Sequence, residues 1–302
     1  LLLLSYLLQY QIMLELLSLS TYLLKKKYKF GFRHNSPIEM IRFRQFAEIE
    51  GAVLPEDDEL LKNEIQNAGF IVDDKVYVID DEIAQELIDI VNNIYKQGHR
   101  VIFYEALQEY QAEWLTEHHI VSEDVLKELL SSNSNYFYIG RNFMTLGERF
   151  TEIEAIVSEL KRIWGECLLL DFASMSERLP MIPLDRIKHA ISCTTEFVWN
   201  SEETYALIDR VVISDVEQSA IIEFAQSTCE TVGYASLSDV PMGAIAEVNY
   251  ELSNTALYNT IYNKILIDIR KGDDIATVIS KYKPQIISCI KATVGEGNYV
   301  SK

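Results

Sequence analysis

Four ionisable residues near the middle of the chain have spacings that could hold a cation. Glu113 and Glu117 are four residues apart and share one helix face, and His118 and His119 follow directly. Adjacent histidines on a helix point about 100° apart, however, and the helix dipole favours a histidine near a C-terminus without any metal. The spacing therefore predicts capping or surface positions for both histidines, and no metal site.

A second pair, His189 and Cys193, has the spacing of a general base and a nucleophile on one helix face. No third group that could orient the histidine is apparent, so Cys193 is predicted to be a core cysteine. Glu159-Leu160-Lys161 matches one end of a nuclease motif, but no aspartate on a strand precedes it, which favours a helix surface. We therefore predict no catalytic residue here.

Sequence motifs for the common enzyme classes are missing as well. The chain contains no GxxxxGK[ST] or GxGxxG phosphate loop, no GxSxG, no HExxH and no EF-hand loop. We expect no cofactor and no enzymatic activity. A fragment of a larger enzyme, with its site assembled from distant carboxylates, stays open as an alternative.

The composition is that of an ordinary globular protein with a strong negative charge. Of its 302 residues 48% are hydrophobic, enough for one large or several small domains. The formal net charge of −19 opposes non-specific nucleic-acid binding, because phosphate contacts depend on basic side chains. The four cysteines form no CxxC motif, which favours a reducing, cytoplasmic setting.

Residues 1–24 are mostly Leu and Tyr, and a basic flank completes a region that we delimit as 1–36. The segment has the length of a membrane span, but Gln9, Gln11 and Glu15 raise the cost of insertion. A helix that is apolar all round needs burial. We expect it to pack against a partner protein or against residues preceding this sequence, and we keep a membrane helix as the alternative.

From residue 37 onward, one order of elements recurs: an amphipathic helix, a short helix with a polar start, then a β-hairpin. We call each occurrence of this order a pass. In the second pass we predict a single amphipathic helix over 101–117. A fourth pass begins near Asp215, but its later part, 243–266, is typical of one long helix, and a last helix follows from residue 272. The predicted hairpins lie at 70–78, 136–144 and 196–208.

This order of elements resembles the winged-helix superfamily, in which helices are followed by a two-stranded wing. The resemblance implies a mainly α fold with small β-hairpins (α+β), built from tandem winged-helix-like units behind the N-terminal apolar helix. The implied divisions are unit 1 with a linker helix at 37–97, unit 2 at 98–149, unit 3 at 150–214, and a degenerate fourth unit with C-terminal helices at 215–302.

Winged-helix proteins typically place the third helix of a unit in the major groove, which requires basic side chains there. The first two such helices begin with acids, at 56–59 and 123–124. The third differs, and a solvated surface is the competing interpretation of its basic residues. The candidate nucleic-acid contacts are Arg178, Arg186, Lys188, His189 and Arg210.

Acidic tandem winged helices more often serve as protein-binding modules of larger nucleic-acid machines, and 17 tyrosines suit a contact surface. We expect a regulatory or interaction subunit of a nucleic-acid-associated complex, contacting a protein partner through residues 1–24. The alternatives are a sequence-specific transcriptional regulator that binds DNA through unit 3, and a membrane-tethered module. Oligomerisation is left open.

Overall fold

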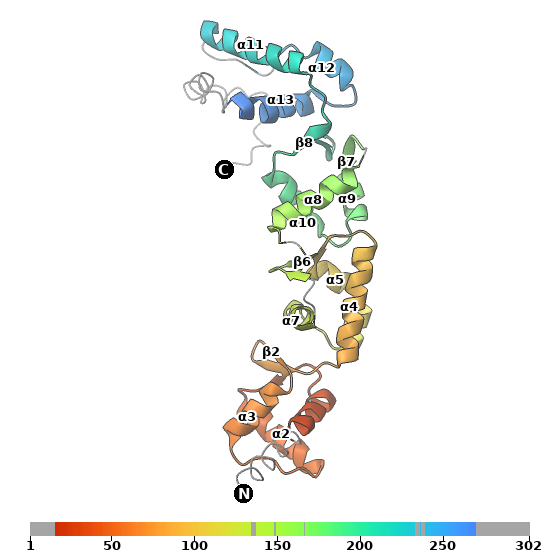
Figure 1. Ribbon diagram of the computed structural model, residues 1–302, viewed down its shortest axis with the longest axis vertical. Coiled ribbons are helices and arrows are strands. Elements are labelled where there is room, and N and C mark those ends of the chain that lie inside the picture. The colour runs from red at the N-terminus through yellow and green to blue at the C-terminus, as the bar shows by residue number, and fades with distance from the viewer. Residues whose placement is uncertain are drawn as a thin grey trace. The chain divides into compact units, whose positions relative to one another are not determined.

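The computed structural model describes residues 16–133, 137–147, 149–165, 167–232, 236 and 239–269 (Figure 1). This part of the chain is mainly helical and contains three small antiparallel sheets of three strands each, which confirms the predicted fold class. The chain divides into two compact units, Leu1–Arg149 and Phe150–Lys302.

The first sheet and its helices occupy residues 16–77. Residues 16–27 are helical, and the first sheet has the order β1-β3-β2. Ser36 caps α2, whose first residue is Pro37, and Asp57 caps α3 by accepting from the backbone of Glu59 at 2.9 Å. The elements are β1 Phe32–Arg33, α2 Pro37–Ile49, α3 Asp58–Asn67, β2 Phe70–Val72 and β3 Lys75–Tyr77.

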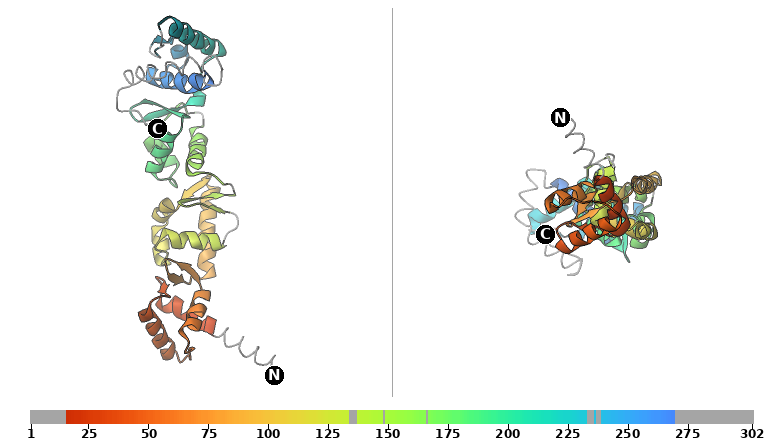
Figure 2. Two further views of the ribbon diagram at one scale, coloured as in Figure 1. Left: turned by 90° about the vertical axis from the view of Figure 1, so that its left-hand side faces the viewer. Right: turned by 90° about the horizontal axis from the view of Figure 1, so that it is seen from below.

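The second sheet belongs to the same compact unit and has the order β4-β6-β5. Its helix α7 lies across α4 (Figure 2, left). The elements are α4 Asp81–Lys96, β4 Val101–Phe103, α5 Tyr104–Tyr110, α6 Ala112–Glu117, α7 Glu123–Asn133, β5 Phe137–Ile139 and β6 Phe143–Leu146.

The predicted single helix over 101–117 is therefore wrong. Val101, Ile102 and Phe103 are all buried and pair with β6, with Phe103 opposite Phe143. Three consecutive large apolar side chains suit a strand covered on both faces, and this burial outweighs the helical spacing of the residues that follow.

The second compact unit contains the third sheet, of order β7-β9-β8, and a group of C-terminal helices. The predicted long helix over 243–266 is interrupted between Asn249 and Ser253, and residues from 270 onward lie outside the described residues. The elements are α8 Glu152–Trp164, β7 Leu169–Asp171, α9 Phe172–Arg178, α10 Leu184–Cys193, β8 Phe197–Ser201, β9 Thr204–Leu207, a 3-10 turn Ile208–Arg210, α11 Asp215–Val232, α12 Gly243–Val248 and α13 Asn254–Ile269.

Each of the three sheets contains one strand that the sequence pattern did not indicate. The hairpins were predicted correctly, but in each sheet a strand preceding two or more helices pairs with the last strand of the hairpin. These first strands have only two or three residues, too few for an alternating pattern to stand out.

One face of the helical residues 16–24 is buried by the chain itself, whereas Ser18 and Tyr22 are exposed. Leu23 and Leu24 pack in one core with Phe43, Ile65 and Val76. For these residues, the burial that we expected from a partner protein is supplied by the first sheet and its helices, while residues 1–15 lie outside the described residues. Among the described residues, no helix is long and apolar enough to span a membrane.

The third sheet shares its core with the C-terminal helices. Val198 and Ala206 of the sheet pack with Ile221, Ile245 and Leu257. Helix α13 lies against β8, and Ser253 at its start donates a 2.7 Å hydrogen bond to the backbone oxygen of Asn200. Residues on both sides of position 215 therefore belong to a single hydrophobic core.

Candidate functional site

Helix α10 carries three of the five predicted nucleic-acid contacts. Ile187, Ala190 and Ile191 turn one face of the helix into the core, so Lys188 and His189 are exposed on the opposite side. The ammonium of Lys188 lies 5.0 Å from the ring centroid of Phe172, in a cation–π contact.

Arg178 and Arg210 both bind backbone carbonyl groups at one end of another helix, α8. Arg178 Nη1 donates to the carbonyl oxygen of Ile163 at 3.0 Å, and the Arg210 guanidinium donates to that of Gly165. Both carbonyls lie at the C-terminal end of α8, where unpaired backbone oxygens and the helix dipole favour cations. The two arginines therefore cap α8.

Arg186 lies at the opposite end of α8. Its Nη1 is 3.3 Å from Glu152 Oε1 in the first turn of that helix, and its Nε is 3.8 Å from Asp185. A helix of 13 residues is about 20 Å long, so Arg186 is separated from the pair at the other end. The five predicted residues thus do not form one basic patch, and the three arginines among them bind acceptors within the protein.

The predicted positions of Cys193 on α10 and Glu159 on α8 are both wrong. Cys193 is exposed, with its Sγ 3.7 Å from His189 Nε2, whereas a core position was predicted. Glu159, predicted on a helix surface, is 1% exposed and paired with Arg162 through contacts of 3.0 and 2.8 Å. Helical spacing alone does not reveal which face of a helix meets the core.

His118 occupies the C-cap of α6, and its ring lies 4.4 Å from that of Trp114. His119 follows with a positive φ of 60°. Within the described part of the chain, no group of three His, Cys, Asp or Glu side chains is placed to hold a metal ion.

The tips of the first and third hairpins each consist of two acids in left-handed conformation. Asp73 and Asp74 have φ values of 49° and 61°, and Glu202 and Glu203 have 46° and 70°. Two-residue turns of this kind normally carry Asn-Gly, because a side chain is strained at positive φ. The sequence pattern located both turns but could not show that these acids take up the left-handed positions.

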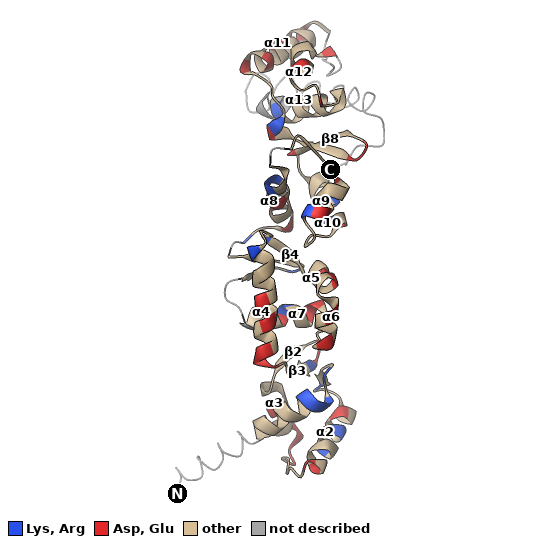
Figure 3. Cartoon of the chain, turned by 90° about the vertical axis from the view of Figure 1, so that its right-hand side faces the viewer, with Lys and Arg blue, Asp and Glu red and all other residues tan. Residues whose placement is uncertain are grey.

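Acids also gather at the start of the helices in the second sheet's region. The first turns of α4 and α7 contain Asp81 with Glu82 and Glu123 with Asp124, respectively, as the red segments of Figure 3 show. Helix dipoles favour this placement. The same charges repel phosphate.

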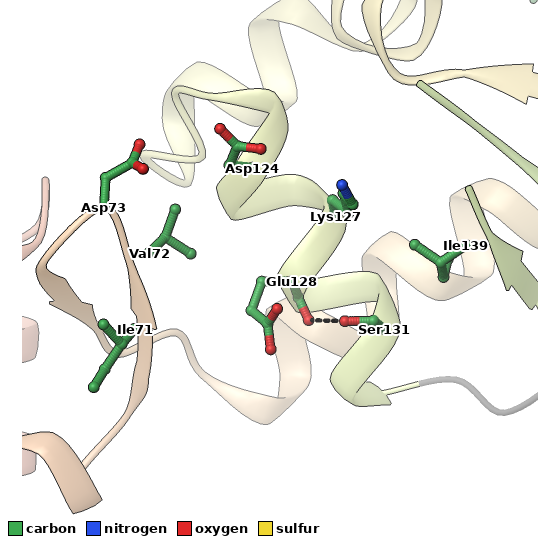
Figure 4. A pocket seen from close by; sticks show the side chains of 8 residues that line it. All are labelled: Ile71, Val72, Asp73, Asp124, Lys127, Glu128, Ser131 and Ile139. Carbon is green, nitrogen blue, oxygen red and sulfur yellow. Dashed lines mark hydrogen bonds between the residues drawn. The ribbon is translucent and has the colours of Figure 1, made fainter. Parts of the chain in front are cut away.

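A cleft of about 530 Å³ lies between β2 and α7, within the first compact unit (Figure 4). It combines apolar side chains with three carboxylates and one ammonium. The sequence pattern gave no signal for it, because its walls come from two different passes of the repeat. Its lining residues are Ile71, Val72, Asp73, Asp124, Lys127, Glu128, Ser131 and Ile139.

Comparison with known proteins adds no family: the sequence matches no protein-family model and no curated protein.

Proposed function

We propose that the protein is a non-enzymatic interaction or regulatory subunit of a nucleic-acid-associated complex, built from winged-helix-like units that bind protein and not DNA. Support for the winged-helix part comes from the recurring order of strand, helices and hairpin, with the first strand paired to the last in all three sheets. We place the protein in the cytoplasm because the sequence spacing of its four cysteines, with no CxxC motif, is unlike that of disulfide-rich secreted domains.

The acidic hairpin tips carry this proposal. A winged-helix protein that reads DNA presents its third helices and wings to the duplex, and phosphate contacts need basic groups there. Asp73 with Asp74 and Glu202 with Glu203 stand at two of the three tips. Such tips repel a DNA backbone and suit a basic protein surface.

Helix α7 provides separate support, because one of its faces is already occupied. Strand β2 packs against α7, and Asp124 near the start of the helix faces the cleft between them. A helix in this position is not free to enter a major groove.

Fluorescence anisotropy with a labelled duplex of about 30 base pairs, measured over a salt series, tests the proposal. We expect no saturable binding by the full chain at physiological salt. Neutralising the tips with Asp73→Asn, Asp74→Gly, Glu202→Asn and Glu203→Gly should increase residual DNA binding if the tips repel it. The matched control neutralises four exposed acids elsewhere: Asp81→Asn, Glu82→Gln, Asp215→Asn and Glu223→Gln.

Tight duplex binding by the unaltered chain, with a steep loss of affinity as salt rises, contradicts the proposal. Metal-dependent cleavage of the same duplex would contradict its non-enzymatic part and favour the enzyme alternative.

A DNA-binding regulator is the second candidate, favoured by the exposure of Lys188 and His189 on one side of α10. In that case Lys188→Ala should weaken specific duplex binding by about 1–3 kcal/mol for each base that the lysine reads. Arg178→Ala is the control, because Arg178 caps α8 and its removal should lower stability without changing DNA affinity. Equal DNA binding by the unaltered chain and Lys188→Ala rejects this candidate.

A further inference from the structure

The cleft between β2 and α7 has room for a long side chain but not for another strand. Strand β2 packs directly against α7, so the space of about 530 Å³ lies beside this contact. That volume exceeds the volume of any single amino-acid side chain. Its walls are β2, the turn residue Asp73, one face of α7 and Ile139 of β5. Four of the eight lining residues are ionisable, so charge decides what the cleft can bind.

The charge of the cleft is negative and is not neutralised by ion pairs. Asp73, Asp124 and Glu128 contribute three carboxylates against the single ammonium of Lys127. In the part of the chain that the structure describes, none of these four groups forms an ion pair. Asp73 and Asp124 are exposed, and Glu128 is half-buried. A cation that enters the cleft therefore meets a net negative charge within reach of solvent.

The cleft also offers apolar surface, which suits a cation on a long aliphatic stem. Figure 4 shows Asp73 at the hairpin turn and Asp124 on α7, on opposite walls of the cleft, with Val72 pointing from β2 towards α7. Ile71 and Ile139 add to the apolar surface. Lysine and arginine bury their aliphatic stems along such surface while the charged head stays near polar groups. The walls of the cleft therefore match a basic side chain better than a small inorganic cation.

Of the two basic side chains, arginine fits the cleft better. Its planar guanidinium can bind two carboxylate oxygens at once in a fixed geometry. It is also more weakly hydrated than an ammonium, so it loses less hydration energy on entering a partly enclosed space. The Glu128 carboxylate accepts a 3.2 Å hydrogen bond from Ser132, which holds this acceptor in place.

We infer that the cleft binds an arginine side chain of a partner protein. The guanidinium pairs with the carboxylates of Asp73, Asp124 and Glu128, and the aliphatic stem lies on the apolar surface. The inference rests on the proposed function, and it names the residue type through which the partner docks.

The test follows the isoleucine δ1 methyl signals of the full chain by NMR, with N-acetyl-arginine amide as the probe. Ile71 and Ile139 line the cleft and report on binding there, whereas Ile221 lies in the core of the C-terminal helices. We expect saturable shifts of the first two signals and no shift of the third. N-acetyl-citrulline amide has nearly the same shape without the charge and should cause no saturable shift. N-acetyl-lysine amide should bind more weakly than the arginine probe.

Two double variants separate the cleft from the overall charge of the chain. Asp124→Asn with Glu128→Gln removes two of the three carboxylates and should raise the dissociation constant of the arginine probe by about tenfold or more. Asp215→Asn with Glu223→Gln removes the same charge from α11, which does not line the cleft, and should change that constant by no more than about twofold. Circular dichroism melting of each variant shows that the altered chain is folded.

Three results overturn the inference: equal saturable shifts with the citrulline probe, no shift of either cleft methyl signal, or equal weakening by the two double variants. Equal affinity for the lysine probe overturns the choice of arginine.

Failure here is distinguishable from failure of the proposed function. Absence of arginine binding together with absence of DNA binding removes the cleft as the docking site and leaves a protein-binding role in place. Steeply salt-dependent duplex binding removes that role, whatever the arginine probe does.

Discussion

The side-chain amide of Asn249 pairs with both backbone polar groups of Val212. Asn249 Oδ1 accepts from the Val212 N–H at 2.9 Å, and Nδ2 donates to the Val212 carbonyl at 2.8 Å and to the Ile245 carbonyl at 2.8 Å. The side chain thus acts as a short strand partner for the segment that follows the third sheet. It ties the C-terminal helices to that sheet across 37 residues of sequence.

Replacing Asn249 with Asp keeps the size of the side chain and removes both donated hydrogen bonds. Because the residue is 5% exposed, the Val212 carbonyl loses its donor inside the protein, and the new carboxylate is buried where an uncharged amide stood. We expect the free energy of unfolding to fall by about 2–4 kcal/mol in urea denaturation. Asn254→Asp, at the exposed first position of α13, is the control and should change it by no more than about 0.5 kcal/mol. Equal effects of the two substitutions contradict this role.

Glycine in place of Glu203 should stabilise the third hairpin. The residue has a φ of 70°, which glycine adopts without the strain that a side chain causes. We expect a gain of about 1 kcal/mol in the free energy of unfolding. The same chemical change at Glu223, within α11, should cost about 1 kcal/mol because glycine weakens a helix interior. Thermal or urea unfolding should therefore show changes of opposite sign in the free energy of unfolding for the two substitutions.

Two tyrosines of the first compact unit whose hydroxyl groups are buried should respond oppositely to removal of the hydroxyl. Among the described residues, Tyr95 Oη has no hydrogen-bond partner, whereas Tyr104 Oη donates to the Gly140 carbonyl at 3.3 Å. Tyr95→Phe therefore removes an uncompensated polar group and should stabilise by about 1 kcal/mol. Tyr104→Phe should destabilise by a similar amount, about 1 kcal/mol. Urea denaturation at neutral pH measures both changes.

Burial raises the pKa of both the Tyr95 and the Tyr104 phenols above the usual 10.0. Stability from a raised pKa is fully present below the unfolded value and is lost as the pH rises from there towards the folded value. The Phe variants should both show a weaker decline in stability above about pH 10. An unchanged decline in either variant contradicts the burial of that hydroxyl.

Acid sensitivity should depend on two carboxylates at helix starts. Backbone N–H donation from Thr151 lowers the pKa of Glu154, and donation from Ser214 lowers that of Glu217, each from 4.5. A lowered folded pKa gives stability that is present above the unfolded value and lost as the pH falls. Glu154→Gln with Glu217→Gln should therefore flatten the fall in stability between about pH 5 and pH 3. Glu223→Gln, at an exposed position in the middle of α11, is the control and should flatten that fall less than the double substitution does.

The local elements of this protein could be predicted from neighbouring residues. Alternating apolar residues around Asp73-Asp74 and Glu202-Glu203 indicated the hairpins, and Pro183 marked the start of α10. Such features depend on turn chemistry and side-chain spacing within a few residues. For the same reason, the acidic character of the two hairpin tips follows from the turn residues alone.

Pairing and burial were decided by residues far apart in the sequence. The strand Val101–Phe103 was predicted as helix because its partner, β6, lies about forty residues later and leaves no local signal. Glu159 is buried and Cys193 exposed because the tertiary packing, and not their spacing, determines which side of each helix meets a neighbour. The cleft between β2 and α7 exists only because two passes of the repeat pack together, so no local pattern could have indicated it.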